Sequence, residues 1–151
     1  MSVEVRAAGI DESHAIVPLY EWLFTPPGSR PAGWEPELAV ERLREAIAAD
    51  RSTVFVAVEA DRFAGLCTAY IDLLSVRFGV RCWVEDLVVD PSRRSEGIGK
   101  ALLAAALTWA AGSGASHLEL DSGDARADAH RFYEREGAQN LSRQFGWWLD
   151  R

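Results

Sequence analysis

The sequence predicts a single α/β (α+β) domain with a central mixed, mostly antiparallel sheet flanked by about four helices. Three strand-like runs follow one another between residues 54 and 89 with only short turns between them, which predicts an antiparallel meander. A helical run after residue 97 then separates this meander from a further short strand, which predicts a parallel, right-handed crossover. The 151 residues contain no repeat and no linker, as expected for one domain spanning 1–151.

The N-terminal third is predicted to form a strand and two helices. Val3-Glu4-Val5-Arg6 alternates in polarity and indicates the strand, and Asp11-Glu12-Ser13 is typical of a helix start. That helix is expected to reach about Phe24, before a Pro/Gly-rich loop over residues 25–33. A second helix follows over 34–49, and its buried side is expected to include Leu38, Leu43 and Ile47.

The rest of the chain supplies the sheet and two more helices. Strands are expected over 54–58, 63–73 and 81–89, and another over 117–120. The helix after residue 97 ends at Gly112-Ser113-Gly114, and its apolar face comprises Ile98, Leu102, Leu103, Leu107 and Ala110. The last long helix covers 125–136, and residues 138–150 are expected to hold two short strands around a turn.

Composition narrows the classes of partner. The net charge of −7 argues against nucleic acid and is compatible with a cationic substrate. No apolar run is long enough to span a bilayer, and no secretory signal is visible, so a cytoplasmic location without membrane partners is expected. Cys67 and Cys82, which can lie opposite each other on a hairpin, are interpreted as reduced core residues, and no metal site is expected.

A short basic loop follows the third strand of the meander. The strand ends at Asp90-Pro91, and the loop carries Arg94-x-x-Gly97-x-Gly99 before the helix begins. Free backbone N–H groups at such a bend can hold a phosphate. A P-loop is excluded because Arg94 and Ala101 replace its first glycine and its hydroxyl, and a Rossmann fingerprint because Leu102 replaces its third glycine. From the loop alone, a plain turn remains an alternative.

Several motifs together resemble one enzyme superfamily. The loop is similar to the pyrophosphate loop of the GNAT superfamily of acetyl-CoA-dependent N-acetyltransferases, and Phe132-Tyr133 followed by Gly137 matches its last helix. Glu85-Asp86 before the loop, and the tail through residues 137–142 and Gly146-Trp147, resemble the polyamine/thialysine acetyltransferase branch. The resemblance implies the superfamily's fold and acetyl-CoA as cosubstrate. That branch forms dimers, which implies a homodimer here.

The resemblance also implies which residues hold the cofactor. The backbone of Leu87, Val88 and Val89 would pair with the pantetheine arm as an added strand would. The N–H groups of the loop would surround the pyrophosphate, and they belong to Arg94, Ser95, Glu96, Gly97, Ile98, Gly99 and Lys100. Phe132 belongs to the matching motif. Arg126 stands where the family often has asparagine, and it can contact a cofactor phosphate or pair with Asp124 or Asp128.

The expected chemistry is transfer of acetyl to a primary amine of a polyamine-like or diamine-like small molecule by direct attack. An alkyl ammonium has a pKa of about 10 and must lose a proton before it attacks. Glu85 is the favoured base and Asp86 the second candidate, because neighbours in a strand face opposite ways unless the strand bulges. Tyr133 is the expected acid for the departing thiolate. Protein or peptide acetylation, and a catalytically silent CoA-binding module, are the alternatives.

The acceptor is expected to meet the first two helices and their connection. Four aromatic residues lie there, and such rings beside carboxylates can hold a cationic amine: Tyr20, Trp22, Phe24 and Trp34. The same rings are also ordinary core material. Trp147 and Trp148 near the end of the chain are candidates for pairing two subunits.

Overall fold

The computed structural model describes residues 2–149, which divide into two compact units. The first extends to Leu120 and holds the sheet with helices α1 to α4, and the second begins at Asp121 and holds helix α5. Each unit is described by itself.

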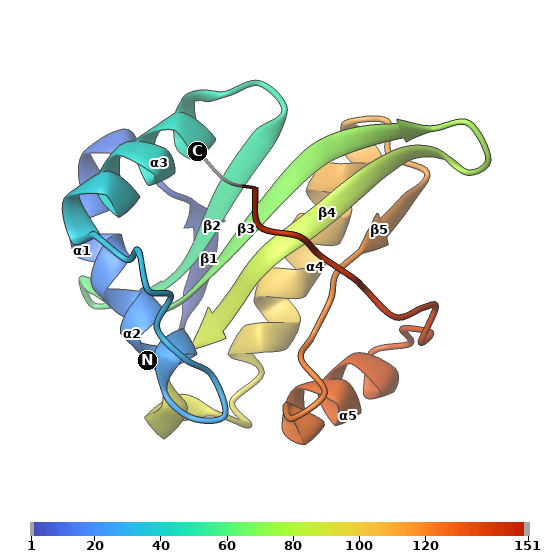
Figure 1. Cartoon of the computed structure of the whole chain (residues 1–151). Helices are drawn as coiled ribbons and strands as arrows, with labels where there is room; N and C mark the ends of the chain where they lie inside the picture. The colour runs from blue at the N-terminus through green and yellow to red at the C-terminus, as the bar shows by residue number, and fades with distance from the viewer. Residues whose placement is uncertain (1, 150–151) are drawn as a thin grey trace. The chain divides into compact units, whose positions relative to one another are not determined.

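A five-stranded sheet is the centre of the first unit (Figure 1). Its strands are β1 (Glu4–Ala7), β2 (Ser52–Glu59), β3 (Arg62–Ser75), β4 (Gly79–Val89) and β5 (His117–Glu119), and they lie in that order. The first three pairings are antiparallel, whereas β5 runs parallel to β4 and pairs only with Arg81–Trp83. The predicted meander, the parallel crossover and the fold class are therefore confirmed.

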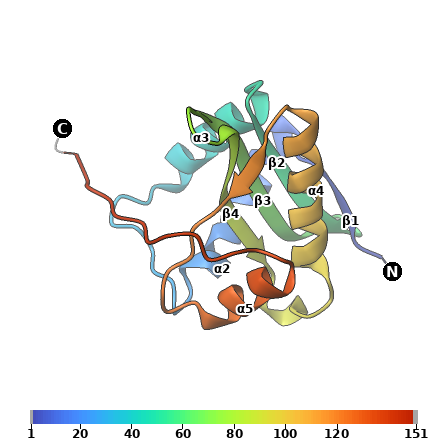
Figure 2. The ribbon, with the colours of Figure 1, turned by 90° about the vertical axis from the view of Figure 1, so that its right-hand side faces the viewer.

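Helices cover both faces of this sheet, and a separate cluster of buried apolar residues lies between each face and its helices. Helices α1 (Ser13–Ile16), α2 (Tyr20–Phe24) and α3 (Pro36–Ala48) lie on one face, and α4 (Ile98–Gly112) lies on the other (Figure 2). Buried residues on the α4 side include Leu102, Cys82 and Val84, and those on the α1–α3 side include Ile16 and Leu66. Two layers of helix around one sheet thus give the chain two cores.

The first predicted helix is broken into short pieces. Between Ile10 and Phe24 the chain forms a 3₁₀ turn (Ile10–Glu12), α1, a second 3₁₀ turn (Val17–Leu19) and α2. Pro18 lies in the second turn and has no backbone N–H to continue an α-helical ladder. A single helix from Asp11 to Phe24 was therefore the wrong prediction, although the segment is helical along most of its length.

Two leucines predicted to be buried are exposed. Leu38 is 38% exposed because the buried stripe of α3 contains Val40, Leu43 and Ala46, and a residue two positions before Val40 points about 200° away from it. Leu107 is 49% exposed because α4 packs through a neighbouring stripe, which includes Leu103, Ala106 and Ala110. Leu43 is buried and Ile47 half-buried, as expected.

The two cysteines are free and buried, but they are not opposite each other. Cys67 pairs with Leu87 and Cys82 pairs with Ile71 in the β3–β4 ladder. The prediction that they face each other across a hairpin was therefore wrong, whereas their interpretation as reduced core residues agrees with the structure.

The second unit is one helix and an irregular tail. Helix α5 (Ala127–Arg135) ends at Gly137, whose φ of 92° allows Ala138 N–H to bond Tyr133 C=O at 2.9 Å and close the helix end. Residues 138–149 form no strand, so the predicted pair of strands is wrong for the described part of the tail, and Asp150 lies outside it. A short two-stranded hairpin is marginally stable without a sheet to join.

Candidate active site

Strand β4 carries a bulge at the predicted acidic pair. Thr68 pairs with Asp86, but the next residue of β3, Ala69, pairs with Val84, so Glu85 has no residue opposite it. An extra residue of this kind shifts the alternation of side chains by one position. Val84 and Leu87 accordingly both pack in the α4-side core, although three positions separate them.

The bulge places both carboxylates on the α1–α3 face. Val84 and Leu87 occupy the other face, so Glu85 and Asp86 between them share this one. Glu85 is exposed and accepts a hydrogen bond at 3.4 Å from the indole of Trp83. The condition set by the sequence, that both acids line one side only if the strand bulges, is met.

Asp86 is the more enclosed of the two acids. Its Oδ2 accepts hydrogen bonds from the hydroxyls of Tyr20 at 2.7 Å and Thr68 at 2.9 Å. Burial raises the pKa of Asp86, and the two hydroxyls partly oppose that shift. Burial first, and the nearby Asp86 charge second, raise the pKa of Tyr20 well above its usual value, so Tyr20 stays a hydrogen-bond donor at neutral pH.

An aromatic cluster adjoins this acidic pair. The Tyr20 ring lies 5.6 Å from the Trp34 ring and 6.4 Å from the Phe24 ring, and Phe24 meets Trp34 edge-on at 4.8 Å. Trp22 instead packs partly buried against the α1–α3-side core. Three of the four aromatic residues expected at the acceptor wall therefore form one cluster, joined to Asp86 through Tyr20.

The loop between β4 and α4 has the backbone expected of an anion site. Asp90 caps its first turn by accepting from Ser92 N–H at 2.9 Å. Ser95 and Gly97 have φ of 68° and 84°, and α4 begins after Gly97. A turn that contains left-handed residues of this kind can direct neighbouring N–H groups toward one point. The Cβ position of Gly97 has no atom within 4 Å, so the backbone is open to a ligand there.

The start of α4 adds donors to this loop. The first bond inside the helix runs from Ala101 N–H to Gly97 C=O at 3.0 Å, so the N–H groups of Ile98, Gly99 and Lys100 precede the helical ladder. The positive end of the helix dipole also favours an anion there. These features fit the pyrophosphate of acetyl-CoA.

Charged side chains of the loop divide into two groups. Arg93 binds Glu59 at 2.7 Å and Glu96 at 2.9 Å, so its charge is compensated within the protein. Arg94 and Lys100 are exposed. They are therefore the side chains of the loop with room to meet a phosphate, whereas Glu96 helps hold Arg93.

Strand β4 has an unpaired edge next to the loop. Strand β5 covers only Arg81–Trp83, and no other strand of residues 2–149 pairs with that edge of β4 beyond them. Leu87, Val88 and Val89 lie in this stretch, where β3 takes up the opposite edge. An extended group can add to such an edge as a further strand would.

The remaining predicted residues belong to the second unit. Phe132 and Tyr133 are half-buried on α5, with ring centroids 5.4 Å apart in an edge-on arrangement. Arg126 is the residue at the start of α5, and its N–H bonds Gly123 C=O at 2.9 Å. Asp128, one of the partners considered for Arg126, forms an ion pair with Arg131.

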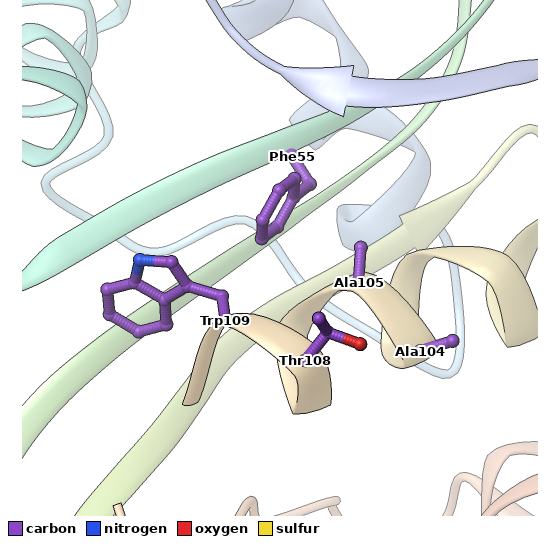
Figure 3. A pocket seen from close by; sticks show the side chains of 5 residues that line it. All are labelled: Phe55, Ala104, Ala105, Thr108 and Trp109. Carbon is purple, nitrogen blue, oxygen red and sulfur yellow. The ribbon is translucent and has the colours of Figure 1, made fainter. Parts of the chain in front are cut away.

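Among residues 2–149, no group of three His, Cys, Asp or Glu side chains is placed to hold a metal ion, and no helix has the length and apolar composition of a membrane span. An open hollow on the α4 side is lined by Phe55, Ala104, Ala105, Thr108 and Trp109 (Figure 3). Thr108 is its single polar lining residue, so the hollow lacks acid–base groups.

Comparison with known proteins relates this chain to acetyltransferases. The model of the acetyltransferase (GNAT) family matches residues 16–138. The chain is 36% identical over 97 residues to an uncharacterized N-acetyltransferase, YhdJ, of Bacillus subtilis, covering 64% of this chain and 68% of that protein. It is also 48% identical over 54 residues to an aminoalkylphosphonate N-acetyltransferase of Salmonella typhimurium, covering 36% and 35%.

Solved structures show the same architecture. An aminoglycoside N-acetyltransferase, AAC(6')-Iy, in complex with CoA matches with a TM-score of 0.84 at 19% identity, covering 98% of this chain and 95% of that one. A transcriptional regulator from Bacillus halodurans C-125 matches with a TM-score of 0.82 at 21% identity, covering 98% and 100%.

The fold, the phosphate-type loop and the family match together define the class. The chain belongs to the GNAT family and is an N-acetyltransferase. The family uses acetyl-CoA as the acetyl donor.

Two features of the site were not found from sequence. Thr68 is 1% exposed, and neither its two-way bond with Asp86 nor the Tyr20–Asp86 bond was expected. The sequence did contain one signal for Thr68, because it is a polar residue among the apolar residues of a strand expected to be buried.

Proposed function

We propose that this enzyme transfers acetyl from acetyl-CoA to a primary amine of a small cationic molecule, of polyamine or diamine type. The observation that carries the proposal is the β4 bulge, which turns Glu85 and Asp86 toward one face beside an aromatic cluster. Carboxylates beside aromatic faces attract an ammonium group by charge and by cation–π interaction. A net charge of −7 favours the same kind of acceptor.

Glu85 is the proposed base. It is exposed, whereas the Oδ2 of Asp86 is taken up by two hydroxyls. Glu85 takes a proton from the ammonium, directly or through a water, and the free amine then attacks the thioester carbonyl. Asp86 supports this step from the same face without accepting the proton.

Tyr133 is the proposed acid. When the tetrahedral intermediate collapses, the C–S bond breaks and the leaving thiolate takes the phenolic proton; the proton that the acetylated nitrogen gives up to form the neutral amide returns to the phenolate through solvent. The thiolate, whose conjugate thiol has a pKa of about 8.5, can take a proton from a phenol of pKa about 10 held beside it, because the two pKa values differ by little. Phe132 supports the Tyr133 ring by its edge-on contact.

The donor is proposed to lie along β4 and its loop. The backbone of Leu87, Val88 and Val89 pairs with the pantetheine arm, and the N–H groups of residues 94–100 hold the pyrophosphate. Gly97 and Gly99 permit close approach, Arg94 and Lys100 add charge, and Arg126 is a further candidate for a phosphate contact. The open Cβ position of Gly97 supports this arrangement.

An aminoalkylphosphonate is a second candidate acceptor. The 48% identity over 54 residues to an enzyme of that name favours it. A phosphonate needs cations, and Arg81, which lies 4.9 Å over the Trp83 ring, already pairs with Asp72 and Glu119. The acidic and aromatic face therefore favours the polyamine-type acceptor.

One acceptor panel separates these candidates. The enzyme is incubated with acetyl-CoA and, in turn, a diamine, a polyamine, an aminoglycoside, an aminoalkylphosphonate and a lysine peptide, and thiol release is followed. We expect the highest kcat/KM with the diamine or polyamine. Preferred turnover of the phosphonate or the peptide would overturn the acceptor class, and thiol release with none of them would overturn the proposed reaction.

A further inference from the structure

Asp86 connects three elements of the fold. The proposed proton transfers do not themselves require this connection. Its carboxylate accepts from Tyr20 of α2 and from Thr68 of β3, while it belongs itself to β4. Both bonds converge on one oxygen, Oδ2. A carboxylate oxygen that is bonded to both α2 and β3 fixes the position of α2, on the acceptor side, relative to the strand that carries Glu85.

Thr68 closes a ring of hydrogen bonds at the bulge. Its Oγ1 accepts from Asp86 N–H at 3.1 Å while its hydroxyl donates to Asp86 Oδ2 at 2.9 Å. A bulge interrupts the backbone ladder and leaves local groups in need of partners. Thr68 satisfies the Asp86 N–H with a side chain, so its hydroxyl holds the bulge in the form that keeps both acids on one face.

Tyr20 connects this ring to the aromatic cluster. Helix α2 has five residues and lies between a 3₁₀ turn and the Pro/Gly-rich loop. So short a helix has little stability of its own and depends on its tertiary attachments. The Tyr20–Asp86 bond is therefore a main polar attachment of α2, and with it of the cluster formed with Phe24 and Trp34, to β4.

The arrangement carries an energetic cost that packing alone does not explain. Among residues 2–149, the side chains that bond the Asp86 carboxylate are two neutral hydroxyls, and neither is a cation. An enclosed carboxylate without a cation opposes folding. Besides burial, the charge of Asp86 raises the pKa of Tyr20 on α2 and of Cys67 and Tyr70 on β3, and the charge of Glu85 on β4 raises the pKa of Tyr20 and Tyr70.

We propose that Asp86 is a positioning residue: through Tyr20 and Thr68 it locks the acceptor wall and the bulge beneath Glu85 into one arrangement. The enzymatic part of this inference rests on the proposed role of Glu85. Tyr20 governs where the acceptor is held, whereas Thr68 governs where Glu85 points.

The first test is kinetic. Tyr20→Phe is expected to raise KM for the amine, and Thr68→Val to lower kcat, each by about 10- to 100-fold, since small misplacements cost that much. Thr68→Ser keeps the hydroxyl and should restore the rate. CoA affinity should be unchanged in all three, and Ser13→Ala is the matched control because it removes a buried hydroxyl that bonds Ile10 C=O rather than Asp86.

A pH–rate profile separates positioning from proton transfer. Asp86→Asn should lower kcat and raise KM yet keep the acidic limb of the profile, because Glu85 still titrates. The double variant Asp86→Asn/Tyr20→Phe should be no worse than the poorer single variant, since one connection is broken twice. Loss of the acidic limb in Asp86→Asn would make Asp86 the base and overturn the proposal. The proposal would also be overturned if the loss of kcat/KM in the double variant equalled the product of the losses in the two single variants.

A second measurement does not depend on any acceptor. Hydrogen exchange of the amides in residues 82–88 should speed up in Tyr20→Phe and Thr68→Val but not in Ser13→Ala. Unchanged exchange would overturn the proposal, even with a fully active enzyme. If exchange is faster in the variants but the wild type acetylates no amine, the positioning role of Asp86 is supported and the proposed function is rejected.

Discussion

At the scale of single residues, two adjacent carboxylates have different surroundings. Glu85 is exposed beside Trp83, whereas Asp86 is enclosed by hydroxyls from Tyr20 and Thr68. Burial raises the pKa of Asp86, so the folded protein binds its proton more tightly than the unfolded chain does. Any stability that Asp86 contributes through this shift is present at low pH and is lost as pH rises through its folded pKa.

Replacing Glu85 tests the proposed base. Glu85→Gln keeps the size of the side chain but removes the proton acceptor, so kcat should fall by about 10²-fold and the acidic limb of the pH–rate profile should disappear. Steady-state rates from pH 5 to 10 provide the measurement. A profile that superimposes on that of the wild type would reject Glu85 as the base.

Replacing Tyr133 tests the proposed acid. Tyr133→Phe retains the ring that contacts Phe132 but removes the proton donor, so kcat should fall about 10- to 100-fold while Kd for CoA stays nearly constant. Turnover and calorimetric titration with CoA measure the two quantities. An unchanged rate in Tyr133→Phe would contradict the assignment.

The two thiols should be unreactive in the native protein. Burial raises the pKa of Cys67 to about 12 and that of Cys82 to about 11, so at pH 8 very little thiolate is present. A thiol-reactive dye at pH 8 should label neither cysteine in the native state and both after unfolding in guanidinium. Rapid labelling of the folded enzyme would show that the β3–β4 core opens readily.

At the scale of elements, the loop before α4 depends on backbone conformation. Ser95 and Gly97 are left-handed, and Arg93 is tied to Glu59 and Glu96 on either side. The sequence indicated a phosphate-binding role for the glycines and the basic side chains of this loop. It did not predict which arginine is taken up by the protein, because Glu59 reaches the loop from β2, 34 residues away.

Gly97 offers a test of the loop. Gly97→Ala keeps the space, since no atom lies within 4 Å of the new Cβ, but strains a φ of 84° by about 1–2 kcal/mol. If the loop relaxes away from this conformation, that strain must be overcome on binding, and we expect Kd for CoA to rise about 5- to 30-fold. Gly114→Ala is the matched control, because Gly114 has a φ of 85° and an equally open Cβ position away from the loop. Equal Kd values for the two variants would contradict the role of the loop.

At the scale of the whole molecule, the chain combines a sheet unit with a C-terminal unit whose tail carries exposed large apolar side chains. Trp147 and Trp148 are 83% and 100% exposed. Large exposed apolar side chains in a row are typical of an interaction surface. They support the proposal, which the resemblance to dimeric acetyltransferases implies, that two copies associate through the tail.

Association can be measured directly. Sedimentation equilibrium should give a mass of about twice 16.6 kDa, and Trp147→Ser/Trp148→Ser should shift it toward one copy. Leu74→Ser, which alters a 72% exposed leucine in the β3–β4 hairpin, is the control and should leave the mass unchanged. A wild-type mass of one copy at all concentrations would contradict the proposed dimer.

The features that depend on local chemistry could be read from the amino-acid order. Alternating strands, the apolar stripe of α4 and the glycine-bearing loop follow from short-range periodicity and backbone preference, so the fold class and the family were predictable. Tertiary structure decided what depends on distant partners. The bulge at Glu85 exists because β3 sets the register of β4, and Asp86 is enclosed because Tyr20, 66 residues away, and Thr68 reach it. Such contacts arise from packing between elements, which local periodicity does not encode.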